Sequence, residues 1–176
     1  MNYVKKLAIS GLCLALAMVL PFLTGQIPQI GAMLSPMHIP VLLCGFICGW
    51  KYGLLVGIVA PSLRYLLFGM PPLFPTGLAM SFELAAYGLL AGILYRILPK
   101  KPCNVYVSLL GAMLGGRIIW GIVMWLISMF AVDVSFGFSA FLAGAFANAV
   151  PGIILHLFLI PIIILPLKKT GYIYND

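Results

Sequence analysis

Long apolar segments, separated by short polar points, make up almost the whole chain. Six of them can be delimited, at residues 7–23, 37–50, 53–68, 76–95, 105–130 and 139–167. A membrane-spanning helix needs about 20 mainly apolar residues, so this pattern is typical of bilayer spans. The second segment opens with Pro36 and Pro40, and we expect it to enter the membrane irregularly or as a short helix. The pattern predicts an all-α integral membrane protein with six transmembrane helices in a single domain, residues 1–176.

Basic residues mark alternate connections between these segments. They lie before the first segment, between the second and third, between the fourth and fifth, and after the sixth: Lys5, Lys6, Lys51, Arg96, Lys100, Lys101, Lys168 and Lys169. The other connections, 24–36, 69–75 and 131–138, contain no Lys or Arg. Cytoplasmic loops are enriched in these residues, so six spans with both termini in the cytoplasm fit every connection. No small-x-small cleavage site follows the first segment, which we therefore interpret as a retained span.

Composition bears on the expected surroundings, partners and metal or disulfide content of the chain. The chain is 64% hydrophobic and 7% charged, and a soluble domain of this length would need a more polar exterior, so membrane lipid is the expected surrounding. The net charge of +7 at pH 7 would suggest a nucleic acid for a soluble protein. Here the charges lie at span ends, and no nucleic-acid partner is expected. The four cysteines form no C-x-x-C pair, which argues against zinc and disulfides.

Three ionisable residues, Arg64, Glu83 and Arg117, fall inside apolar segments. Such residues are costly in a bilayer and indicate a functional site. With about 1.5 Å of rise per residue, Arg64 and Glu83 lie within roughly 5 Å of each other in depth and are predicted to pair across adjacent helices. Arg117 would then be an uncompensated cation and would favour an anionic ligand, such as a carboxylate held by an arginine fork. Alternatively, Glu83 bridges both arginines in a structural triad.

Other polar and aromatic side chains fall near these three. Asn148 is at similar depth, Trp120 follows Arg117 by three positions on the same helix face, and His38 is expected at the outer mouth. His38 also fits a simple role at a helix start, and the deeper His156 fits a satisfied interior histidine. We select Arg117, Glu83, Arg64, Asn148, Trp120 and His38 as candidate substrate-binding residues.

A face of small residues runs along the first segment. Ala8, Gly11 and Ala15 lie on one side of a helix, where small residues let another helix approach closely in lipid. This face could serve either a partner subunit or packing within the chain.

Several catalytic signatures are missing from the sequence. There is no G-x-x-x-x-G-K-[ST] phosphate loop and no H-E-x-x-H zinc motif. Ser139 and His156 would lie about 25 Å apart on a single helix, too far for a nucleophile and its base. We therefore expect no enzymatic activity, no cofactor and no metal. A different class remains open, in which the chain is an autonomous channel or a proton-coupled carrier using Glu83 and His156.

The chain resembles the substrate-binding S components of bacterial energy-coupling factor (ECF) vitamin transporters over essentially its whole length. The similar stretches are Ser10–Ala15, Met37–Pro40, Gly45–Gly53, Gly69–Pro72 and Phe82–Leu84. The resemblance implies a multi-pass protein of the bacterial cell membrane that binds a vitamin in an outer-half cavity under the first two external loops. It also implies separate partner chains, a coupling subunit and an ATPase pair. The family's Ala-x-x-x-Ala docking motif corresponds to Gly11 and Ala15, with Gly in place of the first Ala.

The pattern looks most like the pantothenate-type branch of that family. Pantothenate has a carboxylate that would match Arg117, and hydroxyl and amide groups that would suit Asn148 and Glu83. The charge argument disfavours thiamine, which is a cation. Riboflavin, biotin, a pyridoxine-like vitamin and a cobalamin precursor stay open.

Overall fold

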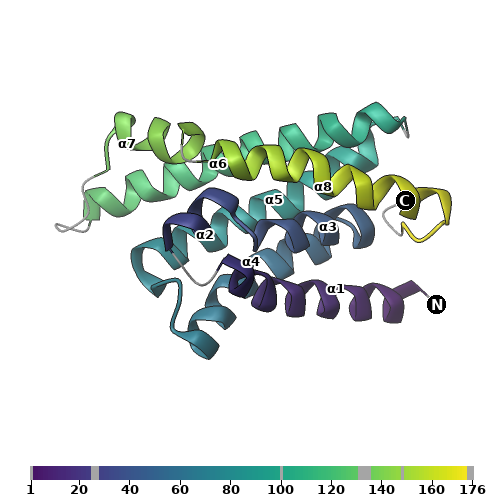
Figure 1. Ribbon diagram of the computed structural model, residues 1–176, viewed down its shortest axis with the longest axis horizontal. Coiled ribbons are helices and arrows are strands. Elements are labelled where there is room, and N and C mark those ends of the chain that lie inside the picture. The colour runs from purple at the N-terminus through teal and green to yellow at the C-terminus, as the bar shows by residue number, and fades with distance from the viewer. Residues whose placement is uncertain (1, 25–27, 100, 131–135, 148, 174–176) are drawn as a thin grey trace.

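A computed structural model of the chain describes residues 2–24, 28–99, 101–130, 136–147 and 149–173. These residues form helices joined by short turns, and no strand occurs among them, so the all-helical class is confirmed (Figure 1). The helices are α1 (Asn2–Val19), α2 (Pro28–Leu34), α3 (His38–Cys48), α4 (Trp50–Phe68), α5 (Leu78–Ile97), α6 (Pro102–Phe130), α7 (Phe138–Leu142) and α8 (Val150–Lys169). A 3₁₀ turn, Leu20–Thr24, follows α1, and a π-helical turn, Ala143–Ala147, precedes α8. The segment Leu73–Gly77 before α5 is kinked, with extended backbone at Phe74.

Among the described residues, five helical stretches are long and apolar enough to cross a membrane. They are Tyr3–Leu23, Trp50–Phe68, Leu73–Ile97, Pro102–Phe130 and Phe138–Lys169. The protein is therefore a multi-pass membrane protein. Figure 1 shows the start of α1 and the end of α8 at the same end of the bundle.

The second apolar segment forms the short helix α3 at the centre of the bundle. All eleven of its residues are buried, and it packs against α1, α4, α5 and α8. At about 1.5 Å per residue it is roughly 16 Å long, which is shorter than a membrane-spanning helix. A helix that is apolar on every side belongs in an interior, and neighbours on several sides explain its burial.

Glycines let α3, α4 and α5 pack backbone against backbone. A Cβ atom on Gly45 of α3 would lie 2.5 Å from the carbonyl oxygen of Gly88 in α5, and one on Gly53 of α4 would lie 2.6 Å from the same oxygen. Close approach through small residues is a main source of helix association in membranes. The α5–α6 contact differs, because a Cβ on Gly111 of α6 would meet only the flexible end of the Leu94 side chain.

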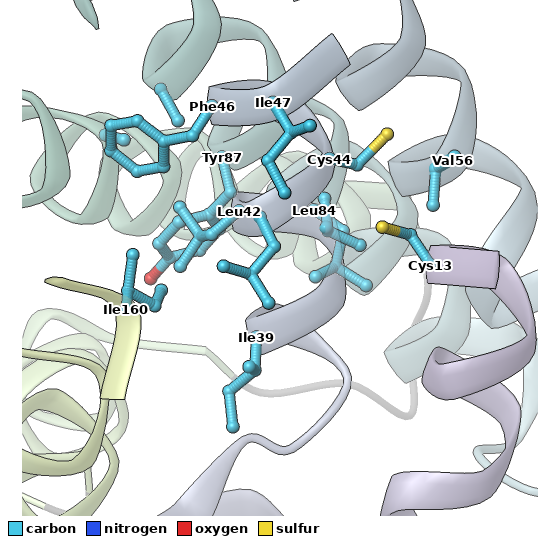
Figure 2. Packing of buried hydrophobic residues seen from close by; sticks show 14 of the residues in the cluster. Cys13, Ile39, Leu42, Cys44, Phe46, Ile47, Val56, Leu84, Tyr87 and Ile160 are labelled. Atoms are coloured by element: carbon cyan, nitrogen blue, oxygen red, sulfur yellow. The ribbon is translucent and has the colours of Figure 1, made fainter. Parts of the chain in front are cut away.

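The buried apolar cluster joins these helices to α1 and α8. Figure 2 shows Leu42 and Phe46 of α3 beside Leu84 and Tyr87 of α5, with Cys13 of α1 and Ile160 of α8 at the two sides. Tyr87, Phe46, Leu42 and Leu84 are among the largest fully buried side chains. This cluster fixes α3 and α5 relative to each other, and both helices carry polar residues of the site described below.

Two predicted regions have a different local structure from the one expected. Part of the first external connection is helical, as α2. The last apolar segment is broken into α7, a π-helical turn and α8, so Ser139 and His156 lie on separate helices. Hydrophobic residues continue through 139–167, so the sequence pattern gives no sign of this break.

Candidate functional site

A buried polar cluster lies where α3, α5, α6 and α8 meet. Oε1 of Glu83 lies 2.9 Å from Nη1 of Arg117 and 3.3 Å from Nε2 of His38. The ring of His156 lies 6.2 Å from that of His38, centroid to centroid. Glu83 is only 2% exposed and His38 and His156 are each 3% exposed, so the cluster is shielded from solvent. Four helices thus each contribute one polar side chain to a single point.

Tyr87 packs directly against this cluster. It follows Glu83 by one helical turn, so the two side chains lie on the same face of α5. Its ring packs edge-on against His38, with centroids 4.9 Å apart and an angle of 85° between the planes. On the other side, Gly116 of α6 leaves room for the ring, because a Cβ there would lie 2.7 Å from Tyr87 Cδ2. Tyr87 therefore helps to hold His38 in place, and Gly116 stands directly before Arg117 in the sequence.

Unsatisfied polar atoms are concentrated in this cluster. Seven buried side-chain nitrogen and oxygen atoms of the described residues have no hydrogen-bond partner. Six of them belong to the cluster: Nδ1 and Nε2 of His38, Oε1 of Glu83, Nε of Arg117, and Nδ1 and Nε2 of His156. The contacts of Glu83 Oε1 are close enough for ion pairs but are not directed as hydrogen bonds. Buried polar groups are normally hydrogen-bonded, so a cluster of unpartnered ones is typical of a site that receives a polar ligand or water.

The predicted pair between Arg64 and Glu83 is wrong, because Glu83 pairs with Arg117. Arg64 faces α1 instead, where its Nη1 donates a hydrogen bond of 2.5 Å to the carbonyl oxygen of Met18. Its guanidinium also lies 5.2 Å from the ring centroid of Phe22 and 5.3 Å from that of Phe68. The prediction used depth alone, and depth does not say which side of a helix a residue occupies.

This correction also removes the argument that Arg117 is an uncompensated cation. One carboxylate and one guanidinium balance each other in the cluster, with His38 and His156 beside them. The alternative triad does not form either, because the second partner of Glu83 is His38 and not Arg64. One geometric feature of Arg117 remains relevant to ligand binding. Glu83 contacts Nη1, while Nε, which belongs to the other edge of the guanidinium, has no partner.

The structure does not place Trp120 in the polar cluster by any contact it shows. Its ring stacks on Phe141 at 6.4 Å and packs edge-on against Phe136 at 5.4 Å. These contacts hold α6 against the segment that leads into α8. An open apolar groove of about 470 Å³ lies beside them, lined by Ile118, Gly121, Ile122, Trp125, Phe136, Gly137, Phe138 and Phe141. Asn148, the remaining candidate, lies outside the described residues.

The face of small residues on α1 is exposed. Ala8, Gly11 and Ala15 are all accessible, and a Cβ on Gly11 would have no atom within 4 Å in the part of the chain that is described. The opposite side of α1 packs against α3, where the Sγ of Cys44 donates to the Oγ of Ser10 at 3.5 Å. The packing partner of α1 inside the chain therefore occupies a different face from the small residues.

Sequence reasoning missed Tyr87 and the role of His38 and His156 as members of one cluster. A signal for Tyr87 was present, since it follows Glu83 by four residues and helical spacing puts both on one face. The two histidines lie at the start of α3 and within α8, and only tertiary packing brings them together. No group of three or more His, Cys, Asp or Glu residues that could hold a metal ion occurs in the described part of the chain.

Comparison with known proteins gives one match. The sequence matches a family model described as "ECF transporter, substrate-specific component" over residues 5–164. No curated protein and no solved structure matches the chain. Proteins of this family are not enzymes; they bind a small-molecule vitamin and associate with the ATPase and membrane components of the transporter. Since the match covers almost the whole sequence, the chain belongs to the family of substrate-specific components of ECF transporters.

Proposed function

We propose that this chain is the S component of an ATP-driven importer in the bacterial cell membrane and that its ligand is a vitamin with a carboxylate group, with pantothenate as the leading candidate. The observation that carries the proposal is the cluster of unpartnered polar atoms around Glu83 and Arg117. In this proposal α3 counts as the sixth crossing, and both termini lie in the cytoplasm. The basic residues on alternate connections support that orientation.

The unpartnered Nε of Arg117 supports a carboxylate ligand. A guanidinium can hold a carboxylate with two parallel N–H donors, and this arrangement is stronger and more directional than a single contact. Glu83 contacts Nη1, and Nε has no hydrogen-bond partner, so Nε is a donor that an external carboxylate could use. The argument for an anionic vitamin thus depends on the geometry of Arg117, and no longer on an excess of charge.

The other unpartnered atoms suit hydroxyl and amide groups. The ring nitrogens of His38 and His156 are available for hydrogen bonds, and Glu83 Oε1 accepts hydrogen bonds. Pantothenate has two hydroxyls and an amide besides its carboxylate, and these could satisfy such a mixed set. Biotin shares the carboxylate, whereas riboflavin lacks it, so these two vitamins are informative competitors.

Arg117→Lys tests the carboxylate fork. Lysine keeps the charge beside Glu83 but cannot present two parallel donors. We expect the affinity for labelled pantothenate to fall about 10- to 100-fold, since hydrogen bonds to charged groups contribute about 1.5–3 kcal/mol. The measurement is equilibrium binding to purified protein, with thermal unfolding as a check of the fold.

Arg64→Lys is the matched control, because Arg64 is also a buried arginine but contacts α1 and aromatic rings. The affinity of the Arg64→Lys variant for pantothenate should match that of the wild type. If Arg117→Lys binds pantothenate as well as the wild type does, the fork argument is wrong. If the wild type binds riboflavin and neither carboxylate vitamin, the proposed substrate class fails.

A further inference from the structure

The C-terminal end of α2 rests directly on the backbone of α8 at Gly152. A Cβ atom at this buried glycine would lie 2.5 Å from the carbonyl oxygen of Met33 and 3.2 Å from the carbonyl carbon of Leu34. Both atoms belong to the backbone, so neither can move aside in the way that the end of a flexible side chain can. Figure 1 shows α2 beside the first part of α8. Only glycine allows α2 and α8 to approach this closely.

The same end of α2 leads directly to His38 through a tight turn. The amide of Ser35, which has a φ of 47°, donates to the carbonyl of Gly31 at 2.8 Å. The amide of His38 then donates to the carbonyl of Ser35 at 3.0 Å. These two backbone hydrogen bonds link the position of His38 to that of the α2 end. A displacement of α2 from α8 therefore changes where His38 lies relative to α8.

Gly152 and His156 are one helical turn apart on α8 and lie on the same face, about 6 Å apart along the axis. The α2–α3 segment therefore contacts α8 at two successive points. The end of α2 meets Gly152, and His38 faces His156 at 6.2 Å. The first contact sets how near the two helices come, and the second lies inside the polar cluster.

We infer that Gly152 is a positioning residue of the substrate site, which sets the spacing of His38 and His156 by letting α2 rest on α8. This inference depends on the proposed function in one respect, namely that the polar cluster binds the vitamin. The atoms nearest to a Cβ at Gly152 are backbone atoms of Met33 and Leu34 and do not belong to the cluster, so Gly152 is assigned an indirect role. It acts through the two histidines, and its effect on binding must therefore depend on them.

The experiment is a Gly152→Ala substitution, with Gly111→Ala as the matched control. Both glycines are helical, and alanine in a helix normally stabilises relative to glycine. At Gly111 the new methyl group would meet only the end of Leu94, whereas at Gly152 it would meet backbone. Without ligand, we expect a lower Tm for Gly152→Ala and an equal or higher Tm for Gly111→Ala. An equal or higher Tm for Gly152→Ala would overturn the inference.

Binding of labelled pantothenate then separates positioning from a general loss of stability. Gly152→Ala should weaken binding by at least about tenfold, because site geometry must hold within roughly 0.5 Å. In a His156→Ala background the same substitution should have little further effect. If the two effects simply add, or if Gly152→Ala leaves affinity unchanged in a wild-type protein that binds, the positioning role is wrong. If the wild type binds neither pantothenate nor biotin, the proposed function fails, and the unfolding comparison still decides whether α2 rests on Gly152.

Discussion

Arg64 and Arg117 are both buried arginines in apolar segments, yet their surroundings differ completely. Arg117 meets the carboxylate of Glu83, whereas Arg64 meets a backbone carbonyl and two aromatic rings. Arg64 bonds to α1 just before the 3₁₀ turn Leu20–Thr24, where the α-helical hydrogen-bond pattern ends. The sequence identified the ionisable residues as special, since charges in spans are rare. It could not assign their partners, because pairing depends on helix rotation.

Replacing Arg64 by glutamine should lower stability without affecting substrate binding. The change removes a charge-assisted hydrogen bond, which contributes about 1.5–3 kcal/mol, and the contacts with Phe22 and Phe68, which contribute about 0.5–2 kcal/mol. Thermal unfolding in detergent should show a lower Tm, and the affinity for pantothenate should stay within a factor of about two, as expected for sites without shared partners. A large loss of affinity at unchanged Tm would instead place Arg64 in the substrate site.

At the scale of helices, much of the architecture could be read from the apolar pattern and the basic residues. Proline residues also lie at the beginning of several helices: Pro28 and Pro102 begin α2 and α6, and Pro151 lies in the first turn of α8. The break before α8 was missed, because hydrophobicity continues through it and Pro151 was not used as a start signal. The close packing of α3, α4 and α5 was also beyond prediction, since glycines are common in spans and only the fold shows which of them meet.

Gly88→Ala tests the contact between these three helices. The new Cβ would collide with backbone atoms of Gly53, so α4 and α5 would have to separate. Overpacking of this kind costs about 1–3 kcal/mol, and we expect a lower Tm and a smaller fraction of monodisperse protein. Gly115→Ala is the control, because its Cβ would meet only the side chain of Leu90. Equal stability of the two variants would contradict the backbone contact.

For the whole molecule, the exposed small face of α1 is the feature that suits assembly with other subunits. The chain belongs to a family whose members work with separate ATPase and membrane components, and Ala8, Gly11 and Ala15 are open to a partner. The docking role is a prediction from the family resemblance, and composition alone could not have supplied it. Close helix approach through small residues gives that role a physical basis.

Gly11→Leu should therefore abolish vitamin uptake while leaving vitamin binding intact. The leucine side chain would fill space that is empty within the described part of the chain, so the fold should tolerate it, but it would hold a partner helix away. Uptake is measured in liposomes that contain the coupling subunit and the ATPase pair, and binding is measured on the purified chain. Unchanged uptake would show that this face does not dock. Uptake by the chain alone, without partners, would favour the autonomous carrier.

The central position of α3 has a consequence for biosynthesis. This helix leaves the ribosome before α4 and α5, yet at roughly 16 Å it is too short to cross a hydrocarbon core of about 30 Å unaided. Its terminal N–H and C=O groups would face lipid without partners, which membranes do not tolerate. Gly53 and Gly88, which hold it in place, are synthesised later. We therefore expect α3, which the proposed topology counts as a crossing, to be among the later helices to insert, and truncation before α5 should leave it outside the bilayer.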